Sequence, residues 1–111
     1  MKSKLHQVSV TETVIDYEGS ITIDEDLLEA GNITINEQVH IYNINNGERF
    51  ITYAIAGERG SKKISVNGAA ARLVHRNDRI IIVAYAIMED NESKIFQPTV
   101  ILFDERNNPI R

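Results

Sequence analysis

Two Gly-Ser dipeptides, Gly19-Ser20 and Gly60-Ser61, are the places where this sequence could do chemistry on its own backbone. A serine hydroxyl can attack the carbonyl carbon of the residue before it when the backbone holds that peptide bent and strained. Glycine at the preceding position adopts the required φ/ψ at the least cost. Each dipeptide is also an ordinary turn signal, so the residues alone leave a reactive bond and a plain turn as alternatives at both positions.

The other polar residues indicate no further chemistry by themselves. The three histidines lie far apart in the sequence and have no metal-ligand spacing, so no metal site is expected. The segment 57–60 lacks the Lys-Ser/Thr pair that completes a phosphate-binding loop, and it is predicted to be a turn between strands. Acidic pairs such as Asp24 and Asp26 are expected to face solvent.

Length, charge and composition limit the possible classes of protein. The 111 residues predict a single domain, residues 1–111. The formal net charge of −4 argues against a general nucleic-acid binder, because counterion release needs clustered Lys and Arg. The lack of cysteine excludes disulfide scaffolds and thiol nucleophiles and fits a reducing compartment. No apolar stretch approaches the roughly 20 residues that cross a bilayer, so we expect a soluble cytoplasmic protein without a membrane partner.

The elements that must position the reactive residues are predicted to be mostly β-strands. The sequence has 17 Ile, 8 Val and 6 Thr against 5 Leu, and branching at Cβ favours a pleated strand over a helix. Asn46-Gly47 is typical of a tight hairpin turn. About seven strands are expected, at residues 4–11, 20–23, 38–45, 48–57, 63–66, 79–88 and 96–103.

Two short helices complete the predicted fold. Asp24 can cap a helical turn that ends at Gly31, and the segment 67–74 has the length of two helical turns. Short strands with two small helices and no linker predict a mainly β domain that closes into a barrel and leaves no open sheet edge.

Four segments of the sequence together carry a resemblance to a known family. They are Lys4–His6 with Tyr17–Ser20, Asn46–Ile55, Glu58–Ser61 and Ile64–Ala71. In order and spacing they resemble the bacterial pyruvoyl-dependent aspartate 1-decarboxylase (aspartate α-decarboxylase) family over essentially the whole chain. The resemblance implies a double-psi β-barrel. It also strongly favours Gly19-Ser20 over Gly60-Ser61 as the reactive dipeptide.

The resemblance implies an inactive precursor that cuts itself between Gly19 and Ser20. Ser20 Oγ would attack the Gly19 carbonyl, and the family assigns the stabilisation of the resulting oxyanion to the threonine that matches Thr52. Loss of the Ser20 α-proton, elimination and hydrolysis would leave a chain 1–19 and a chain 20–111 that begins with a pyruvoyl group. This group, without a metal, is the implied cofactor. Maturation is either spontaneous or assisted by a helper protein.

The implied reaction is the decarboxylation of L-aspartate to β-alanine and CO2 for pantothenate and coenzyme A biosynthesis. The pyruvoyl ketone would be the electron sink, Tyr53 would return a proton to the substrate carbon, and Arg49 with Lys4 would bind the carboxylates. The family is a homotetramer with active sites between neighbouring subunits. The expected lining of the pocket comprises Asn67, Gly68, Ala69 and Ala70, with His6, Tyr17 and Tyr42 around it.

Two alternatives stay open. Arg49 and Tyr53 share one face of a regular strand while Thr52 points the other way, so either a bulge intervenes or the two faces line the sites of different subunits. The chain could also be a non-catalytic or unprocessed barrel that serves as a small-molecule binding or regulatory module. Without the resemblance, Arg49 and Tyr53 would be taken for ordinary surface residues beside a hairpin.

Overall fold

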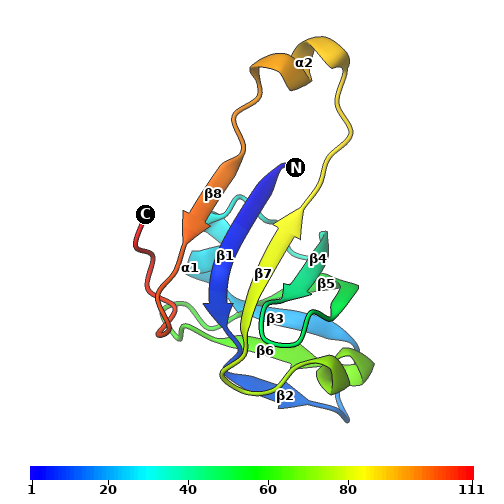
Figure 1. The fold of residues 1–111 in the computed structure, drawn as a ribbon, viewed down its shortest axis with the longest axis vertical. Helices are drawn as coiled ribbons and strands as arrows, with labels where there is room; N and C mark the ends of the chain where they lie inside the picture. The colour runs from blue at the N-terminus through cyan, green and yellow to red at the C-terminus, as the bar shows by residue number, and fades with distance from the viewer.

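The computed structural model describes residues 1–111 and arranges them as eight strands, two α-helices and one 3-10 helix (Figure 1). The mainly β class predicted from the branched residues is confirmed. No helix is both long and apolar enough to span a bilayer. The strands are β1 (Ser3–Ser9), β2 (Glu12–Val14), β3 (Ser20–Asp24), β4 (Gln38–Asn43), β5 (Arg49–Gly57), β6 (Ile64–Asn67), β7 (Arg79–Ala84) and β8 (Thr99–Leu102). The helices are α1 (Glu25–Ala30), η1 (Gly68–Leu73) and α2 (Asp90–Ile95).

The strands join in one sheet with the order β2-β6-β3-β5-β4-β7-β1-β8. The pairs β2/β6, β3/β5 and β1/β8 are parallel, and the other four pairs are antiparallel. In Figure 1, β1, β7 and β8 run upright while β2, β3 and β6 cross below them, so the two halves of the sheet enclose a core. The barrel keeps two short edges, β2 and β8, where we had expected complete closure, because each of these strands has a partner on one side only.

The core consists mainly of β-branched side chains on the inner face of the sheet. On β3, Ile21 and Ile23 are fully buried, and on β6 so are their cross-strand partners Val66 and Ile64. Burying an Ile or Val side chain stabilises the fold by about 1.5–3 kcal/mol. A slip of one residue would turn these side chains outward, and the core therefore specifies the register of each strand.

The first predicted strand, residues 4–11, is shorter in the structure and contains a bulge. β1 ends at Ser9, and its register against β7 shifts between His6 and Val8, where Gln7 has a φ of +67°. The Arg79 guanidinium donates two hydrogen bonds to the Gln7 carbonyl, at 2.9 and 2.6 Å. Arg79 therefore holds the bulge in place across the β1/β7 pair.

The predicted strand at residues 79–88 also ends early. β7 stops at Ala84, and residues 85–98 leave the barrel as an arm that carries α2 (Figure 1). α2 buries none of its residues, and no apolar periodicity in the sequence predicts it. Ile87 and Ile95 of the arm are strongly exposed. An apolar run alone does not keep a segment in the sheet when no strand lies beside it.

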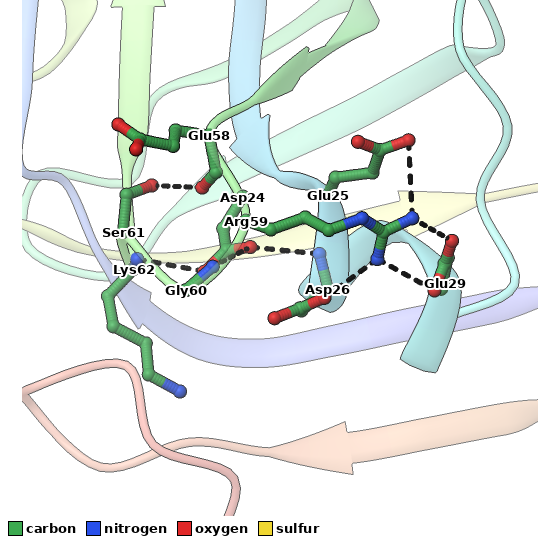
Figure 2. Close-up of polar contacts among 9 residues, drawn as sticks. All are labelled: Asp24, Glu25, Asp26, Glu29, Glu58, Arg59, Gly60, Ser61 and Lys62. Carbon is green, nitrogen blue, oxygen red and sulfur yellow. Dashed lines mark hydrogen bonds and ion pairs between the residues drawn. The ribbon is translucent and has the colours of Figure 1, made fainter.

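Asp24 connects the end of β3 to two other elements. As predicted for a helix cap, its carboxylate accepts a 2.8 Å hydrogen bond from the Asp26 N–H at the start of α1. The expectation that Asp24 faces solvent is wrong, because the residue is fully buried. The same carboxylate accepts hydrogen bonds from the backbone N–H groups of Gly60 (3.1 Å) and Lys62 (2.8 Å), as Figure 2 shows. Asp24 thus fixes β3 to the turn between β5 and β6.

Arg59 makes a second, more exposed link between this turn and α1 (Figure 2). Its guanidinium donates to Asp26 at 2.7 Å and to Glu29, and it lies 3.5 Å from Glu25. The hydrogen bond from Arg59 lowers the pKa of Glu29. Exposed ion pairs of this kind contribute little to stability, so the buried Asp24 is the stronger of the two links.

The second Gly-Ser dipeptide is part of this turn. Gly60 has a φ of +78°, and Ser61 Oγ donates to the Glu58 carbonyl at 2.5 Å. The side chain of Ser61 is therefore engaged within its own turn, as the plain-turn interpretation of Gly60-Ser61 requires.

We expect Asp24→Ala to lower the free energy of unfolding by roughly 3 kcal/mol, because three backbone N–H groups lose their charged acceptor. Urea unfolding followed by circular dichroism measures this change. Asp26→Ala is the matched control, since its side chain is 54% exposed and contacts only Arg59. Equal losses in the two variants would contradict the role given to Asp24.

Candidate active site

Ser20 is the first residue of β3, and its side chain lies inside the protein. Only 2% of Ser20 is exposed. In the antiparallel pair of β3 with β6, Ser20 lies opposite Asn67, and Asn67 Nδ2 donates a 3.0 Å hydrogen bond to Ser20 Oγ. The serine predicted to be reactive therefore has a fixed hydrogen-bond partner within the chain.

Asn67 is itself held by two hydroxyl groups. Its Nδ2 also donates to Thr22 Oγ1 at 2.9 Å, and its Oδ1 accepts a 2.9 Å hydrogen bond from Ser65 Oγ. Side chains two residues apart share a strand face, so β3 and β6 bring four polar side chains together. Thr22 and Ser65 were not predicted as site residues, although the alternation of polar and branched residues in these two strands was a signal for them.

Gly68, directly after Asn67, packs against the backbone of Gly19. Its φ is +75°, and a Cβ at this position would lie 2.8 Å from Gly19 Cα and 3.1 Å from the Tyr17 carbonyl oxygen. Gly19 has no left-handed φ, and a Cβ there would meet no atom within 4 Å. The position whose φ and close contacts require glycine is therefore Gly68.

Other predicted lining residues also gather near Ser20. η1 confirms the predicted helical segment after Asn67, and it places Ala69 at the surface and Ala70 half-buried. Tyr17 is 55% exposed. It lines a hollow of about 240 Å³ together with Asn67 and its neighbours Thr22 and Ser65. This side of the barrel therefore offers a small open space next to the polar cluster.

Tyr53 lies on the same face of the sheet as Ser20. The parallel pair of β3 with β5 places Ile21 beside Ala54, so Tyr53, one residue earlier, is level with Ser20. Tyr53 is 39% exposed. The face of the sheet that carries Ser20 therefore also carries Tyr53, and the role of Tyr53 as proton donor stays a prediction.

Thr52 points to the opposite face of β5. The register of β4 with β5 is continuous from Tyr53 to Arg49, and this excludes the bulge that would have turned Thr52 towards Tyr53. Ser20 Oγ accepts a hydrogen bond from Asn67, and Thr52 forms none with it. Within one chain, then, the structure does not bring Thr52 to the Ser20 hydroxyl.

The remaining predicted residues lie on the outer face of the other half of the sheet. Cross-strand pairs place Arg49 beside Tyr42, Tyr42 beside Ile81, and Ile81 beside His6. Lys4 lies two residues before His6 on the same face of β1. We call Arg49, Tyr42, His6 and Lys4 the outer row.

Aromatic contacts orient Arg49 within the outer row. Its guanidinium carbon lies 4.4 Å from the centre of the Tyr42 ring, which is a cation–π contact. The hydroxyls of Tyr42 and Tyr85 are 2.7 Å apart, and this hydrogen bond raises the pKa of Tyr42. The Tyr85 ring packs edge-on against His40. Arg49, Tyr42 and His40 line a hollow of about 430 Å³. Tyr85 and His40 were not predicted, because nothing in their sequence positions indicates that they meet.

The pKa of His6 lies below the ordinary value of a histidine. Burial lowers its pKa, and the nearby charges of Lys4 and Arg79 lower it further. Its Nδ1 is buried without a hydrogen-bond partner in the chain.

No three His, Asp or Glu side chains lie close enough together to bind a metal ion.

The outer row and the Ser20 cluster are separate within one chain. Strand residues advance by about 3.3 Å, so Arg49 lies about 13 Å along β5 from Tyr53. β1 is four strands from β3 in the sheet order, so Lys4 and Ser20 do not lie on neighbouring strands. The structure therefore divides the predicted site residues into two groups that one chain does not join.

Comparison with known proteins supports both the family and the fold. The sequence profile of the aspartate decarboxylase family matches residues 1–110. Aspartate 1-decarboxylase from Thermoanaerobacter pseudethanolicus is 56% identical over 110 residues, which cover 99% of this chain and 94% of that protein. Aspartate 1-decarboxylase from Caulobacter vibrioides is 57% identical over 107 residues, 96% of this chain and 91% of that protein.

Among solved structures, the chain is similar to the computationally designed msDPBB_sym2 protein, a double-psi β-barrel. The TM-score is 0.53 at 15% sequence identity, with 68% of this chain and 95% of the designed chain covered. At this identity the likeness concerns the fold alone. It confirms the predicted double-psi β-barrel architecture.

Gly68→Ala is expected to destabilise the protein by about 1–3 kcal/mol more than Gly47→Ala. Both glycines have φ near +75°, but only a Cβ at Gly68 would collide with another segment, the backbone of Gly19. The Gly47 variant therefore isolates the cost of the backbone conformation. Thermal unfolding of both variants measures the difference, and equal losses would show that the contact with Gly19 is unimportant.

Proposed function

The chain belongs to the aspartate decarboxylase family, and we propose that its reaction, the decarboxylation of L-aspartate to β-alanine and CO2, depends on a pyruvoyl group made from its own Ser20. The observation that carries this proposal is the buried Ser20 hydroxyl with Asn67 as its hydrogen-bond donor. The family resemblance favours this serine, and the side chain of the competing Ser61 is engaged within its own turn.

The proposed self-cleavage uses only atoms of the chain and water. Ser20 Oγ attacks the Gly19 carbonyl carbon, and the peptide bond becomes an ester as the Ser20 nitrogen leaves. Loss of the Ser20 α-proton then eliminates Gly19 as a carboxylate and leaves a carbon–carbon double bond at residue 20. Addition of water releases ammonia and leaves a ketone. The single domain 1–111 thereby becomes chains 1–19 and 20–111.

The surroundings of Ser20 fit such a group. Asn67 would hold the new carbonyl group at residue 20 by a hydrogen bond, and the hollow beside Asn67 leaves room for a small ligand. When present, the pyruvoyl group supplies an electron-accepting carbonyl that no ordinary side chain offers. Asn67 is the donor whose contact with Ser20 supports a role in cleavage. The oxyanion role of Thr52 stays a prediction.

The proposed roles of the other residues follow from where they lie. Tyr53, level with Ser20 and partly exposed, would donate the proton that replaces CO2 on the substrate carbon. Arg49 would hold a substrate carboxylate by two parallel hydrogen bonds, and Tyr42 would hold the guanidinium in place. Lys4 would add a second positive charge for the dianionic substrate.

The distance between the two groups supports an assembly in which neighbouring copies share each active site. The outer row of one chain would complete the Ser20 cluster of the next, in agreement with the homotetramer that the sequence predicts. Exposed apolar side chains that such contacts could cover include Ile51 beside the outer row and Ile87 on the arm. A cytoplasmic location, a product destined for pantothenate and a maturation factor stay predictions.

The alternative of a non-catalytic binding barrel is not favoured, because the similar curated proteins are named as decarboxylases over nearly the whole chain.

Ser20→Ala is expected to abolish cleavage and decarboxylation without unfolding the protein, because only the attacking oxygen is removed. Intact-mass measurement after warming, with borohydride reduction to reveal the ketone, reports the outcome. Ser61→Ala is the matched control and should be cut like the wild type between residues 19 and 20. Normal turnover of aspartate by Ser20→Ala would refute the pyruvoyl proposal.

Mixing two inactive variants tests the shared site. Ser20→Ala lacks the reactive group but keeps its outer row, and Arg49→Ala keeps the reactive group but lacks its guanidinium. We expect each variant alone to lose at least about 100-fold in kcat/KM. When the two variants are co-expressed and assemble together, we expect them to regain a substantial part of the activity. Recovery would be absent if all the residues of a site came from one chain. Arg72→Ala, which alters an exposed arginine of η1, serves as the control for loss of charge.

A further inference from the structure

We propose that Ser65 and Thr22 are positioning residues for the cleavage between Gly19 and Ser20, because they fix the carboxamide of Asn67 against the Ser20 hydroxyl. This inference rests on the proposed self-cleavage and adds to it two residues whose hydroxyls form hydrogen bonds with Asn67.

The proposal starts from the hydrogen bonds that the Asn67 carboxamide makes. An asparagine side chain has two N–H groups and one carbonyl oxygen. One N–H donates to Ser20 Oγ at 3.0 Å and the other to Thr22 Oγ1 at 2.9 Å, while Oδ1 accepts from Ser65 Oγ at 2.9 Å. Every polar atom of the carboxamide thus has a partner, and two of these partners are hydroxyls outside the reacting bond.

Burial makes these contacts effective. Ser20, Ser65 and Asn67 are each at most 3% exposed, and hydrogen bonds in such surroundings are stronger than at the surface. The β3/β6 register pairs Ser20 with Asn67 and Thr22 with Ser65. The four side chains are therefore held by the backbone of two strands rather than by a loop.

The contact with Asn67 gives the Ser20 side chain a defined direction. A serine side chain has three staggered rotamers, and attack on the preceding carbonyl can proceed only from those that bring Oγ to that carbon. Because Oγ accepts its hydrogen bond from Asn67, Asn67 does not hold the Ser20 hydroxyl proton, and that proton is free to leave during attack. The orientation of the carboxamide therefore matters for the reaction.

Loss of either hydroxyl would release the carboxamide. Without the Ser65 hydroxyl, Asn67 Oδ1 is left buried and unpaired unless the amide rotates by half a turn. The rotated amide would present Oδ1 to Ser20 and Thr22, and Ser20 would then donate its proton to Asn67 instead of accepting a hydrogen bond. In either case fewer molecules have the arrangement that favours attack.

The experiment measures the rate of appearance of chain 20–111 by intact mass in freshly purified precursors. We expect Ser65→Ala and Thr22→Val to be cut at least about tenfold more slowly than the wild type, which is the effect of one lost buried hydrogen bond. Ser65→Thr, which keeps the hydroxyl on a strand-compatible side chain, should recover most of the rate. Urea unfolding is recorded in parallel to confirm that each variant is folded.

Ser3→Ala is the matched control. Ser3 is as deeply buried as Ser65, its Oγ has no hydrogen-bond partner, and it lies on β1, away from Ser20. Its variant should be cut at the wild-type rate. Cleavage of Ser65→Ala at the wild-type rate, or equal slowing in Ser3→Ala, would overturn the positioning role while leaving the cleavage itself intact. An uncut wild-type chain would instead overturn the proposed function, and this inference with it.

Discussion

The hydrogen bond between Asn67 and Ser20 exists because one strand pair, β3 with β6, is held in a single register. In that register Ile21 and Val66 meet inside the core, and the residues next to them, Ser20 and Asn67, meet on the opposite face. A shift by one residue would expose the apolar pair and break the polar one. The packing of the hydrophobic core therefore sets the register that brings the Asn67 amide to the Ser20 hydroxyl.

Both ends of β3 are anchored by contacts that leave little freedom. At one end the buried carboxylate of Asp24 binds the start of α1 and the turn after β5. At the other end Gly68 lies so close to Gly19 that a methyl group would not fit between them. The bond between Gly19 and Ser20 therefore lies where an exposed segment enters a fixed, buried strand, which would suit the proposed cleavage at this one peptide bond.

The two groups of site residues have different surroundings. Around Ser20 the partners are neutral amides and hydroxyls, buried and fully paired, and these suit a reaction of the backbone. The outer row contains the cations Arg49 and Lys4 on an open face, with an aromatic ring under the guanidinium, and these suit the capture of a charged substrate. Since one chain keeps the groups apart, contact between copies would be part of the active site and more than a source of stability.

The sequence by itself determined the β class and the capped helix after Asp24, because these depend on residue types and on local order along the chain, and its resemblance over nearly the whole chain indicated the family. It could not determine that Asp24 is buried, that Gly68 rather than Gly19 requires glycine, or that Ser65 and Thr22 surround Asn67. It also could not place Tyr85 beside Tyr42 or end β7 at Ala84. Only the tertiary structure decided these, because each depends on which distant segments lie side by side, and that follows from how the whole sheet closes over its core.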